Sequence, residues 1–321
     1  MTFRRPSIRV DELAFRAGTG AFALLLVGIV VAIGVLLFKE SALSIQAFGW
    51  SFWASEDWNP VSGEFGARPF IWGTLYSSIL ALAISTPIAL GIAIYISELA
   101  PGWLRRPLVF LTELLAAIPS IVYGLWGIFV LVPFVRALQV RTPGWMQAIP
   151  LFEGPPLGIG MLSAALILSI MVIPFSSSVA REVLKAVPQA QREGAYALGA
   201  TRWEAIRMAL FYARTGIVGA IMLGFGRALG ETMAVTMVIG NSPQISWSLY
   251  APQYTMSAVL ANEFAEAAGD LYLAALIEIG LVLFIITLLI NVISRLFIWS
   301  MATHARPRWS FLRAFALRGA S

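Results

Sequence analysis

An arginine and a glutamate lie close together inside an otherwise apolar stretch of this 321-residue chain. Arg227 and Glu231 fall near the middle of the run from Gly216 to Gly240, which is long enough for the ~20 residues that a bilayer-spanning helix needs. If the run is one helix, their i, i+4 spacing places both side chains on one face and predicts an ion pair. A guanidinium can also bind two oxygens of a tetrahedral oxyanion, so this pair favours reversible anion binding.

Two interpretations of this pair stay open on the sequence alone. A charge at the bilayer centre costs roughly 2.5–3.5 kcal/mol, so both side chains should face protein or water. They could form a structural salt bridge between packed helices, or they could line a solute pathway together with Thr232. In the second case Glu231 neutralises Arg227 until an anion displaces it. Small residues let a helix or a solute approach the backbone closely, and three glycines flank the pair: Gly224, Gly226 and Gly230.

The composition indicates which elements must position these residues. The chain is 59% hydrophobic and only 12% charged, whereas an ordinary soluble domain is about 25% charged. Long apolar runs therefore predict an all-α integral membrane protein. The sequence has no cysteine and one histidine, His304, which excludes disulfides, thiolate metal sites and a histidine-based catalytic centre. We expect no metal site, and the net charge of +5 is spread over several loops, which does not suggest nucleic-acid binding.

Six apolar runs have the length of transmembrane helices. They cover residues 17–38, 70–96, 108–135, 158–180, 216–240 and 271–300. We expect a transmembrane domain over 17–300, with a polar connection at 181–214, an N-terminal segment at 1–16 and a tail at 301–321. The first run is too long for a cleavable signal peptide and lacks a convincing cleavage site.

Basic residues are distributed unequally between the two sides that six spans define. One side carries only Lys39, Arg68, Arg136 and Arg141. The side with both termini carries the other lysines and arginines, apart from the intramembrane Arg227. Because basic residues are retained in cytoplasmic loops, this distribution predicts that both termini are cytoplasmic.

The polar connection has helix signals of its own. Pro188 suits the first turn of a helix over 189–198, and Gly199 suits its end. Thr201 and Glu204 then match the T-x-x-E capping box, so a second short helix should begin at Thr201. We expect two short helices that meet at Gly199 and form a compact cytoplasmic knob.

Other polar residues in the spans are secondary candidates for the pathway. Glu113 lies near the cytoplasmic end of its span and could pair with a loop arginine, while Glu278 could bond to a neighbouring helix. Both are expected to be structural. Ser120 follows a proline, and intramembrane serines more often hydrogen-bond neighbouring helices. No activating base stands out for the serines of the spans, which argues against a membrane enzyme.

The polar connection also resembles a known motif. Glu193-Gly194-Ala195, with Gly199 six positions after Glu193, is similar to the EAA motif of ABC-importer permeases, although Gly194 replaces an alanine and the later proline of the family is missing. In that family this loop docks into a groove of a cytoplasmic ATPase. The residues to which the resemblance assigns a coupling role are Glu193, Gly194, Ala195, Gly199, Thr201 and Glu204.

Longer segments resemble the C-type permeases of the Pst phosphate importer. These are ELLAAIPSIVYGLWG (113–127), EGAYALGATRWEAIR (193–207), GRALGETMAVTMVIGN (226–241) and ANEFAEA (261–267), with WNP at 58–60 and FGARPFIWGTL at 65–75. The resemblance covers about 48–299 and implies a type I ABC importer (MetI-like) permease fold that translocates inorganic phosphate across the bacterial inner membrane. It implies a heterodimer with a PstA-like permease, two PstB-like ATPase subunits, a periplasmic PstS-like binding protein and contact with lipid.

The resemblance gives this chain no enzymatic activity and no bound cofactor. A G-x-x-x-x-G-K-[ST] phosphate loop is absent from the sequence, so ATP and Mg would be used by the partner ATPase. One buried arginine suits any oxyanion, so an importer of sulfate or molybdate stays as an alternative. A membrane subunit with only a structural or signalling role is the other alternative.

Overall fold

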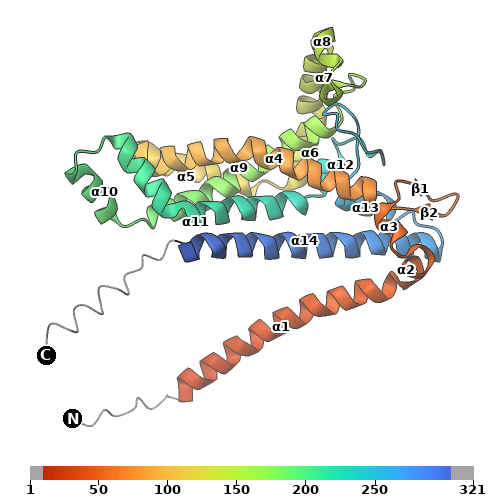
Figure 1. Cartoon of the computed structure of the whole chain (residues 1–321), viewed down its shortest axis with the longest axis horizontal. Coiled ribbons are helices and arrows are strands. Elements are labelled where there is room, and N and C mark those ends of the chain that lie inside the picture. The colour runs from red at the N-terminus through yellow and green to blue at the C-terminus, as the bar shows by residue number, and fades with distance from the viewer. Residues whose placement is uncertain (1–9, 305–321) are drawn as a thin grey trace.

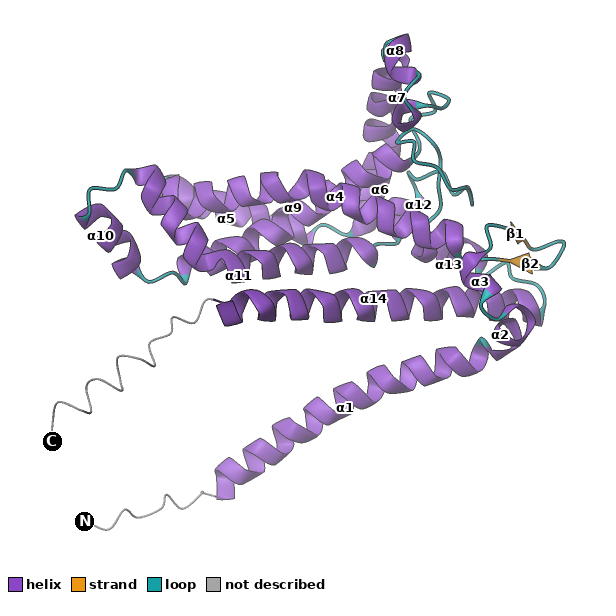
Figure 2. Ribbon diagram, viewed as in Figure 1, coloured by secondary structure: helices purple, strands orange, loops and turns teal. Residues whose placement is uncertain are grey.

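The protein is a bundle of long helices with very little other secondary structure. The computed structural model describes residues 10–304 (Figure 1). Most of the N-terminal segment predicted at 1–16, and all but the first residues of the tail predicted at 301–321, lie outside this range. In the described part the only sheet is an antiparallel hairpin of β1 (Trp58–Asn59) and β2 (Glu64–Phe65), visible at one end of the bundle in Figure 2.

The helices differ widely in length. In chain order they are α1 (Val10–Glu40), α2 (Ala42–Phe48), α3 (Ser51–Ala54), α4 (Arg68–Ile94), α5 (Gly102–Ala117), α6 (Ser120–Trp126), α7 (Val132–Val140), α8 (Gly144–Gln147), α9 (Met161–Lys185), α10 (Gln189–Ala197), α11 (Arg202–Leu229), α12 (Met233–Thr236), α13 (Met256–Glu263) and α14 (Asp270–His304). Two π-helical segments, η1 (Tyr95–Leu99) and η2 (Gly127–Leu131), continue α4 and join α6 to α7, and η3 (Pro150–Phe152) is a 3-10 turn.

The predicted number of membrane spans is confirmed. Six stretches of the described chain are long and apolar enough to cross a bilayer: 14–40, 68–99, 120–140, 161–185, 202–229 and 270–301. Backbone polar groups inside lipid must be bonded within their own segment, which is why the apolar runs adopt helices.

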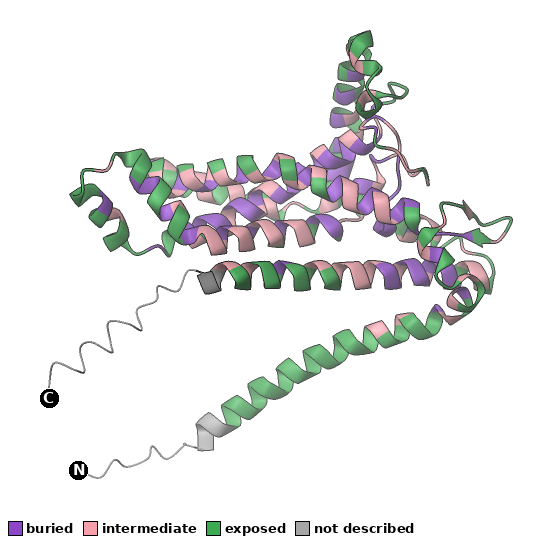
Figure 3. Ribbon diagram, viewed as in Figure 1, coloured by how far each residue is buried: buried purple, intermediate pink, exposed green. Residues whose placement is uncertain are grey.

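Helix α9 lies at the centre of the bundle. It packs against α4, α5 and α11, while α14 lies along α11 (Figure 1). The α9 side chains Ser163, Ala164, Ala165 and Ser169 are all buried, and small side chains of this kind let helix backbones approach closely. Helix α1 instead diverges from the bundle and exposes nearly all of its apolar surface (Figure 3). An apolar helix that is exposed all round needs lipid or another subunit around it.

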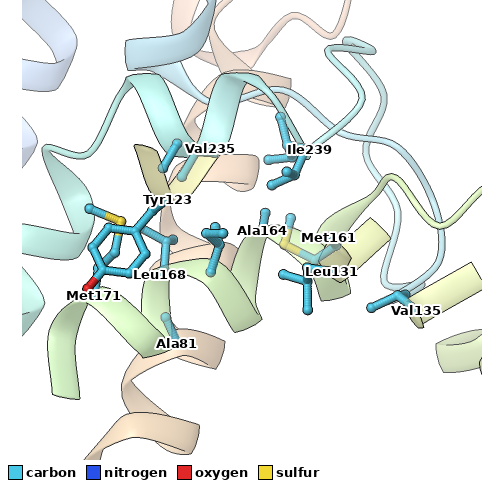
Figure 4. Packing of buried hydrophobic residues seen from close by; sticks show 13 residues of the cluster. Ala81, Tyr123, Leu131, Val135, Met161, Ala164, Leu168, Met171, Val235 and Ile239 are labelled. Atoms are coloured by element: carbon cyan, nitrogen blue, oxygen red, sulfur yellow. The ribbon is translucent and has the colours of Figure 1, made fainter. Parts of the chain in front are cut away.

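One hydrophobic cluster unites segments that are far apart in the sequence. Tyr123 of α6, Leu168 and Met171 of α9, and Val235 of α12 pack together in it (Figure 4). Gly124 allows this approach, because a methyl group at that position would lie only 3.2 Å from the backbone Cα of Ala234 in α12. Helices α6 and α12 are therefore held against each other and against α9.

The third predicted span is wrong as a single helix over 108–135. Helix α5 ends at Ala117, and Ile118 and Pro119 have extended backbones with ψ of 130° and 140° before α6 begins. The segment from α6 to α7 then leaves the bundle at a steep angle (Figure 1). Tyr123 closes the interruption, because its hydroxyl donates to the carbonyl of Leu115 at 2.8 Å. This bond satisfies one of the carbonyl groups that the end of α5 leaves free.

Gly73→Ala is expected to destabilise the protein by about 3 kcal/mol. A methyl group at Gly73 would collide with the backbone carbonyl of Tyr254, which cannot move as a flexible side chain could. Gly91→Ala on the same helix is the matched control: nothing lies within 4 Å of its Cβ position, so this change should be neutral or stabilising by roughly 0.5–1 kcal/mol. Thermal unfolding of the detergent-solubilised protein measures both, and equal stabilities of the two variants would contradict this packing.

Candidate functional site

The fifth predicted span, 216–240, is interrupted at the position of its charged residues. The helix predicted over 216–240 is instead α11, which ends at Leu229, and the four-residue α12, which starts at Met233. Gly230, Glu231 and Thr232 form the interruption between them. Non-helical backbone at membrane depth is tolerated where it is buried in protein or lines a polar cavity. Interrupted helices of this kind form the substrate sites of many transporters.

Arg227 lies in the last turn of α11, on an exposed face of this chain. Its Cζ is 5.8 Å from the centre of the Phe175 ring of α9, within the range of a cation–π interaction. The end of α11 also favours a cation, because the carbonyl ends of helix dipoles carry partial negative charge. Gly224, one turn earlier, packs so closely on α9 that a methyl group there would collide with Ser176. These contacts hold α11 in place and leave the guanidinium accessible.

Glu231 and Thr232 are half-buried in the interruption. The backbone carbonyl of Glu231 accepts a hydrogen bond from Ser257 Oγ at 2.9 Å. The carbonyl of Thr232 accepts one from Thr236 Oγ1 at 2.8 Å. Side chains from later in the sequence therefore replace part of the helical hydrogen bonding that the interruption removes.

The predicted ion pair between Arg227 and Glu231 is not formed. Among the ion pairs of residues 10–304, none joins these two side chains. The i, i+4 spacing places side chains on one face only within a continuous helix, and this helix ends between them, at the Gly230 cap. The structure keeps Arg227 on α11 and moves Glu231 beyond its end.

A second interrupted helix meets the first. The break at Ile118–Pro119 precedes α6, and α6 packs against α12, which follows the break at Gly230–Thr232. Ser120, the first residue of α6, is half-buried beside the first break. Sequence analysis missed this convergence, although Pro119 and the glycines before Glu231 were visible signals.

The polar connection forms the helix that was predicted. Helix α10 runs over Gln189–Ala197, and Gly199 adopts a φ of 82° at the turn that follows. The capping box at Thr201 and Glu204 is present, with Glu204 N donating to Thr201 Oγ1 at 3.4 Å and Thr201 N donating to Glu204 Oε2 at 2.7 Å. The second short helix is a wrong prediction: it is the start of α11, which continues without a break to Leu229.

The tip that contains α10 presents both charged and apolar side chains. Glu193, Gly194, Thr201 and Glu204 are exposed, while Ala195 is buried against the turn. Three large apolar side chains are exposed with them, and Leu198 is 91% exposed; they are Tyr196, Leu198 and Trp203. These exposed apolar side chains stand within an otherwise polar element of the chain. Sequence analysis did not single out these three residues.

The two secondary carboxylates lie in different environments. Glu113 accepts from Arg181 Nη2 of α9 at 3.4 Å, and the Arg181 side chain is only 7% exposed. Arg181 also bonds to Glu182 at 2.9 Å. Glu113 therefore pairs with a basic residue of the polar connection, as its position near a span end suggested. Glu278 is buried on α14, and its Oε2 has no hydrogen-bond partner within the described residues.

Gly199→Val is expected to disrupt the turn between α10 and α11. A left-handed backbone costs a side-chain-bearing residue about 1–2 kcal/mol, and a β-branched residue more. The open space around Gly199 means that this cost is conformational and not a collision. Gly63→Val is the matched control, because Gly63 also has a left-handed backbone, with a φ of 72°, and open surroundings, but lies in the β1–β2 hairpin. The first variant should reduce transport-coupled ATP hydrolysis at normal membrane abundance, and the second should not; equal activities would contradict this role of the turn.

Comparison with known proteins defines the class that this architecture represents. The sequence pattern described as "Binding-protein-dependent transport system inner membrane component" matches residues 85–302. The chain is 48% identical over 292 residues to the phosphate transport system permease protein PstC of Mesorhizobium japonicum, covering 89% of both chains. It is 49% identical over 295 residues to the protein of that name from Pasteurella multocida, covering 90% of this chain and 92% of the relative.

Solved structures agree at the level of the fold. A chain from an inward-facing structure of the MetNI methionine ABC transporter superposes with a TM-score of 0.55 at 18% identity, covering 72% of this chain and 94% of that chain. The six-span, all-α permease fold is thus the one predicted, and the chain is a subunit of a membrane transporter. It belongs to the binding-protein-dependent transport system inner membrane component family, among the PstC phosphate transport system permeases.

Proposed function

We propose that this chain is a transmembrane subunit of an ABC importer that carries inorganic phosphate across the bacterial cytoplasmic membrane. The observation that carries the proposal is the identity of 48–49% to permeases named for phosphate transport, over about nine-tenths of each chain. The interrupted helices at Pro119 and Gly230 support a transport role, because such helices provide polar backbone groups inside the bilayer.

The proposed importer contains partners that supply what this chain lacks. The exposed, diverging α1 fits a heterodimer with a second, PstA-like permease. ATP and Mg would be bound by two PstB-like ATPase subunits, because this sequence has no phosphate loop. A periplasmic PstS-like protein would deliver phosphate.

Coupling to the ATPase is assigned to the tip of the bundle that carries α10. Glu193, Thr201 and Glu204 offer charged and polar contacts there, and Leu198 and Trp203 offer apolar ones. Gly194 leaves one face of α10 open, and Ala195 and Gly199 shape the turn. A mixed surface of this kind suits an interface whose centre is apolar and whose rim is polar.

The phosphate pathway is assigned to Arg227, Glu231 and Thr232. Phosphate needs a compensating cation to cross an apolar barrier, and the guanidinium of Arg227 is exposed on the bundle surface at the helix interruption. Conduction also requires weak binding so that the anion can leave. Glu231 follows Arg227 by four residues and lies beyond the end of α11. Its role in the proposal is to oppose tight anion binding without neutralising Arg227 permanently.

The proposed topology, with both termini in the cytoplasm, can be tested by labelling single cysteines, since the chain has none. Ser62 in the hairpin turn and Gln244 in the loop after α12 are exposed, whereas α10 and its exposed Ala197 lie at the other end of the bundle (Figure 1). A membrane-impermeant thiol reagent added outside spheroplasts should label Ser62→Cys and Gln244→Cys but not Ala197→Cys. The reverse pattern would contradict this topology.

Uptake by the reconstituted importer tests the proposed function directly. Proteoliposomes are assembled with both permeases and the ATPase, with the binding protein on the periplasmic side and ATP on the cytoplasmic side. They should accumulate radioactive phosphate. Sulfate and molybdate should neither compete nor accumulate. Uptake of one of these oxyanions instead would favour the alternative substrate, and ATP-independent or absent accumulation would contradict an importer role.

A further inference from the structure

One guanidinium of α10 bonds both to α9 and to the end of α4. Arg192 of α10 donates to both carboxylate oxygens of Glu98, from Nη2 to Oε1 at 2.7 Å and from Nε to Oε2 at 3.2 Å. It also donates from Nη1 to the carbonyl of Val187 at 2.8 Å and from Nη2 to that of Leu184 at 2.9 Å. Arg192 therefore joins α10 both to the end of α9 and to a helix 94 residues earlier in the chain.

Glu98 lies in η1, the π-helical end of α4. Two further arginines bond to the backbone there: Arg202 Nη2 donates to the carbonyl of Glu98 at 2.9 Å, and Arg105 Nη2 donates to that of Ser97 at 3.0 Å. Single π-helical turns within α-helices are frequent at functional sites. The starts of α5 and α11 and the whole of α10 are thus attached to this one turn.

Burial distinguishes this ion pair from a surface pair. The side chains of Arg192 and Glu98 are 21% and 12% exposed, whereas those of Arg68 and Glu56, another pair with a 2.7 Å separation, are 55% and 54% exposed. Water and salt screen exposed pairs, and a partly buried bidentate pair is screened less. Glu98 and Arg192 therefore form a partly buried, bidentate connection between α10 and the end of α4.

The opposite end of α4 holds the loop that follows α12. Trp72 Nε1 donates to the carbonyl of Ser246 at 3.0 Å, and the hydroxyl of Tyr76 donates to that of Trp247 at 2.8 Å. From Arg68 to Leu99 the helix runs for 32 residues, roughly 48 Å at 1.5 Å per residue. One continuous helix therefore connects α10 with the loop at the other end of the bundle.

This end of α4 is also tied to the interruption in the fifth span. Met256 N donates to Thr74 Oγ1 of α4 at 2.9 Å. The next residue, Ser257, donates from Oγ to the carbonyl of Glu231 at 2.9 Å. Two consecutive residues of α13 thus bridge α4 and Glu231.

We propose that the Glu98–Arg192 pair is the joint that transmits movement of α10 along α4 to the interruption at Gly230–Thr232. This inference rests on the proposed function, in which α10 docks on an ATPase. Coupling between distant sites is carried by packed and hydrogen-bonded elements that move together. When the ATPase displaces α10, the joint makes α4 follow, and the contacts of Thr74 shift the segment that is bonded to Glu231. Glu98 and Arg192 are positioning residues that touch neither ATP nor phosphate.

The test separates coupling from assembly. Glu98→Gln keeps the shape of the side chain and removes its charge, and Arg192→Lys keeps the charge and removes the fork. Phosphate uptake and ATP hydrolysis are measured on equal amounts of assembled complex. The ratio of uptake to hydrolysis should fall about tenfold in Glu98→Gln, within the usual range of coupling between sites, and by less in Arg192→Lys. A merely structural pair would lower both activities together, with the ratio unchanged.

Glu56→Gln is the matched control, because it breaks the exposed pair with Arg68 and should leave the ratio unchanged. An unchanged ratio in both joint variants would overturn the proposal. Failure of both variants to bind the ATPase would overturn it too, by assigning the pair to docking. If the wild-type complex hydrolyses ATP without accumulating phosphate, the proposed function fails instead, and that result is read before any variant is compared.

Discussion

Arg227→Ala is expected to lower ATP-dependent phosphate uptake about a hundredfold, because loss of a charge-assisted contact to the anion costs about 3 kcal/mol. The permease complex should still assemble. Arg227 is exposed and belongs to no ion pair among residues 10–304, so its removal leaves no buried carboxylate unpaired. Uptake into proteoliposomes, normalised to the assembled complex, measures the effect.

Two variants control for charge and for position. Arg227→Lys keeps a cation but cannot bind two oxygens through a planar fork, so it should retain part of the uptake. Arg214→Ala removes another guanidinium of α11, which lies 4.5 Å from the ring of Phe211. Arg214 lies nearer the start of the helix than Arg227, so the Arg214→Ala variant should transport phosphate normally. Wild-type uptake by Arg227→Ala would remove Arg227 from the pathway.

The double variant Arg227→Met/Glu231→Leu is expected to remain about as inactive as Arg227→Ala. If the two residues formed a structural salt bridge, replacing both with apolar residues would be tolerated and would restore transport. The structure instead places Glu231 beyond the end of α11, with its backbone bonded to Ser257. Because the two side chains form no ion pair, two apolar residues have nothing to compensate. The double variant still lacks the cation of the pathway.

Glu231→Gln alone provides the second comparison. Its uptake should fall about tenfold without loss of the complex, because an unopposed Arg227 would hold the anion about 1.4 kcal/mol too tightly for release. Membrane abundance and uptake are measured side by side for the single and double variants. Recovery of uptake in the double variant would show that the pair is structural.

Local features of this protein could be predicted because they depend on residues close together in the chain. The capping box at Thr201 and Glu204 and the left-handed turn at Gly199 are of this kind. The capping box bonds backbone groups that the start of a helix leaves free, and the glycine permits a left-handed backbone. Both effects act within one or two helical turns. The six spans were also visible, because lipid requires a long uninterrupted apolar run from every crossing helix.

The helix interruptions could not be located in the same way. Pro87 and Pro174 lie inside the continuous helices α4 and α9, whereas the chain leaves the helix at Pro119. In a membrane neighbouring helices can satisfy the groups that a proline frees, so proline alone does not mark a break. The apolar run from Gly216 to Gly240 likewise predicts one continuous helix. The break at Gly230 instead coincides with tertiary contacts, in which α12 packs against α6, α9 and α13 and Glu231 is bonded to Ser257.

The sequence by itself determined that the protein lies in a membrane, how many spans it has and the shape of the α10 turn. These properties follow from hydrophobicity and local hydrogen bonding. Tertiary structure decided which charges meet. Arg227 and Glu231, four residues apart, do not pair, because the helix ends between them. Glu98 and Arg192, 94 residues apart, form a bidentate pair, because packing brings the end of α4 against α10. Such a pairing depends on the whole bundle, and no local pattern of residues specifies it.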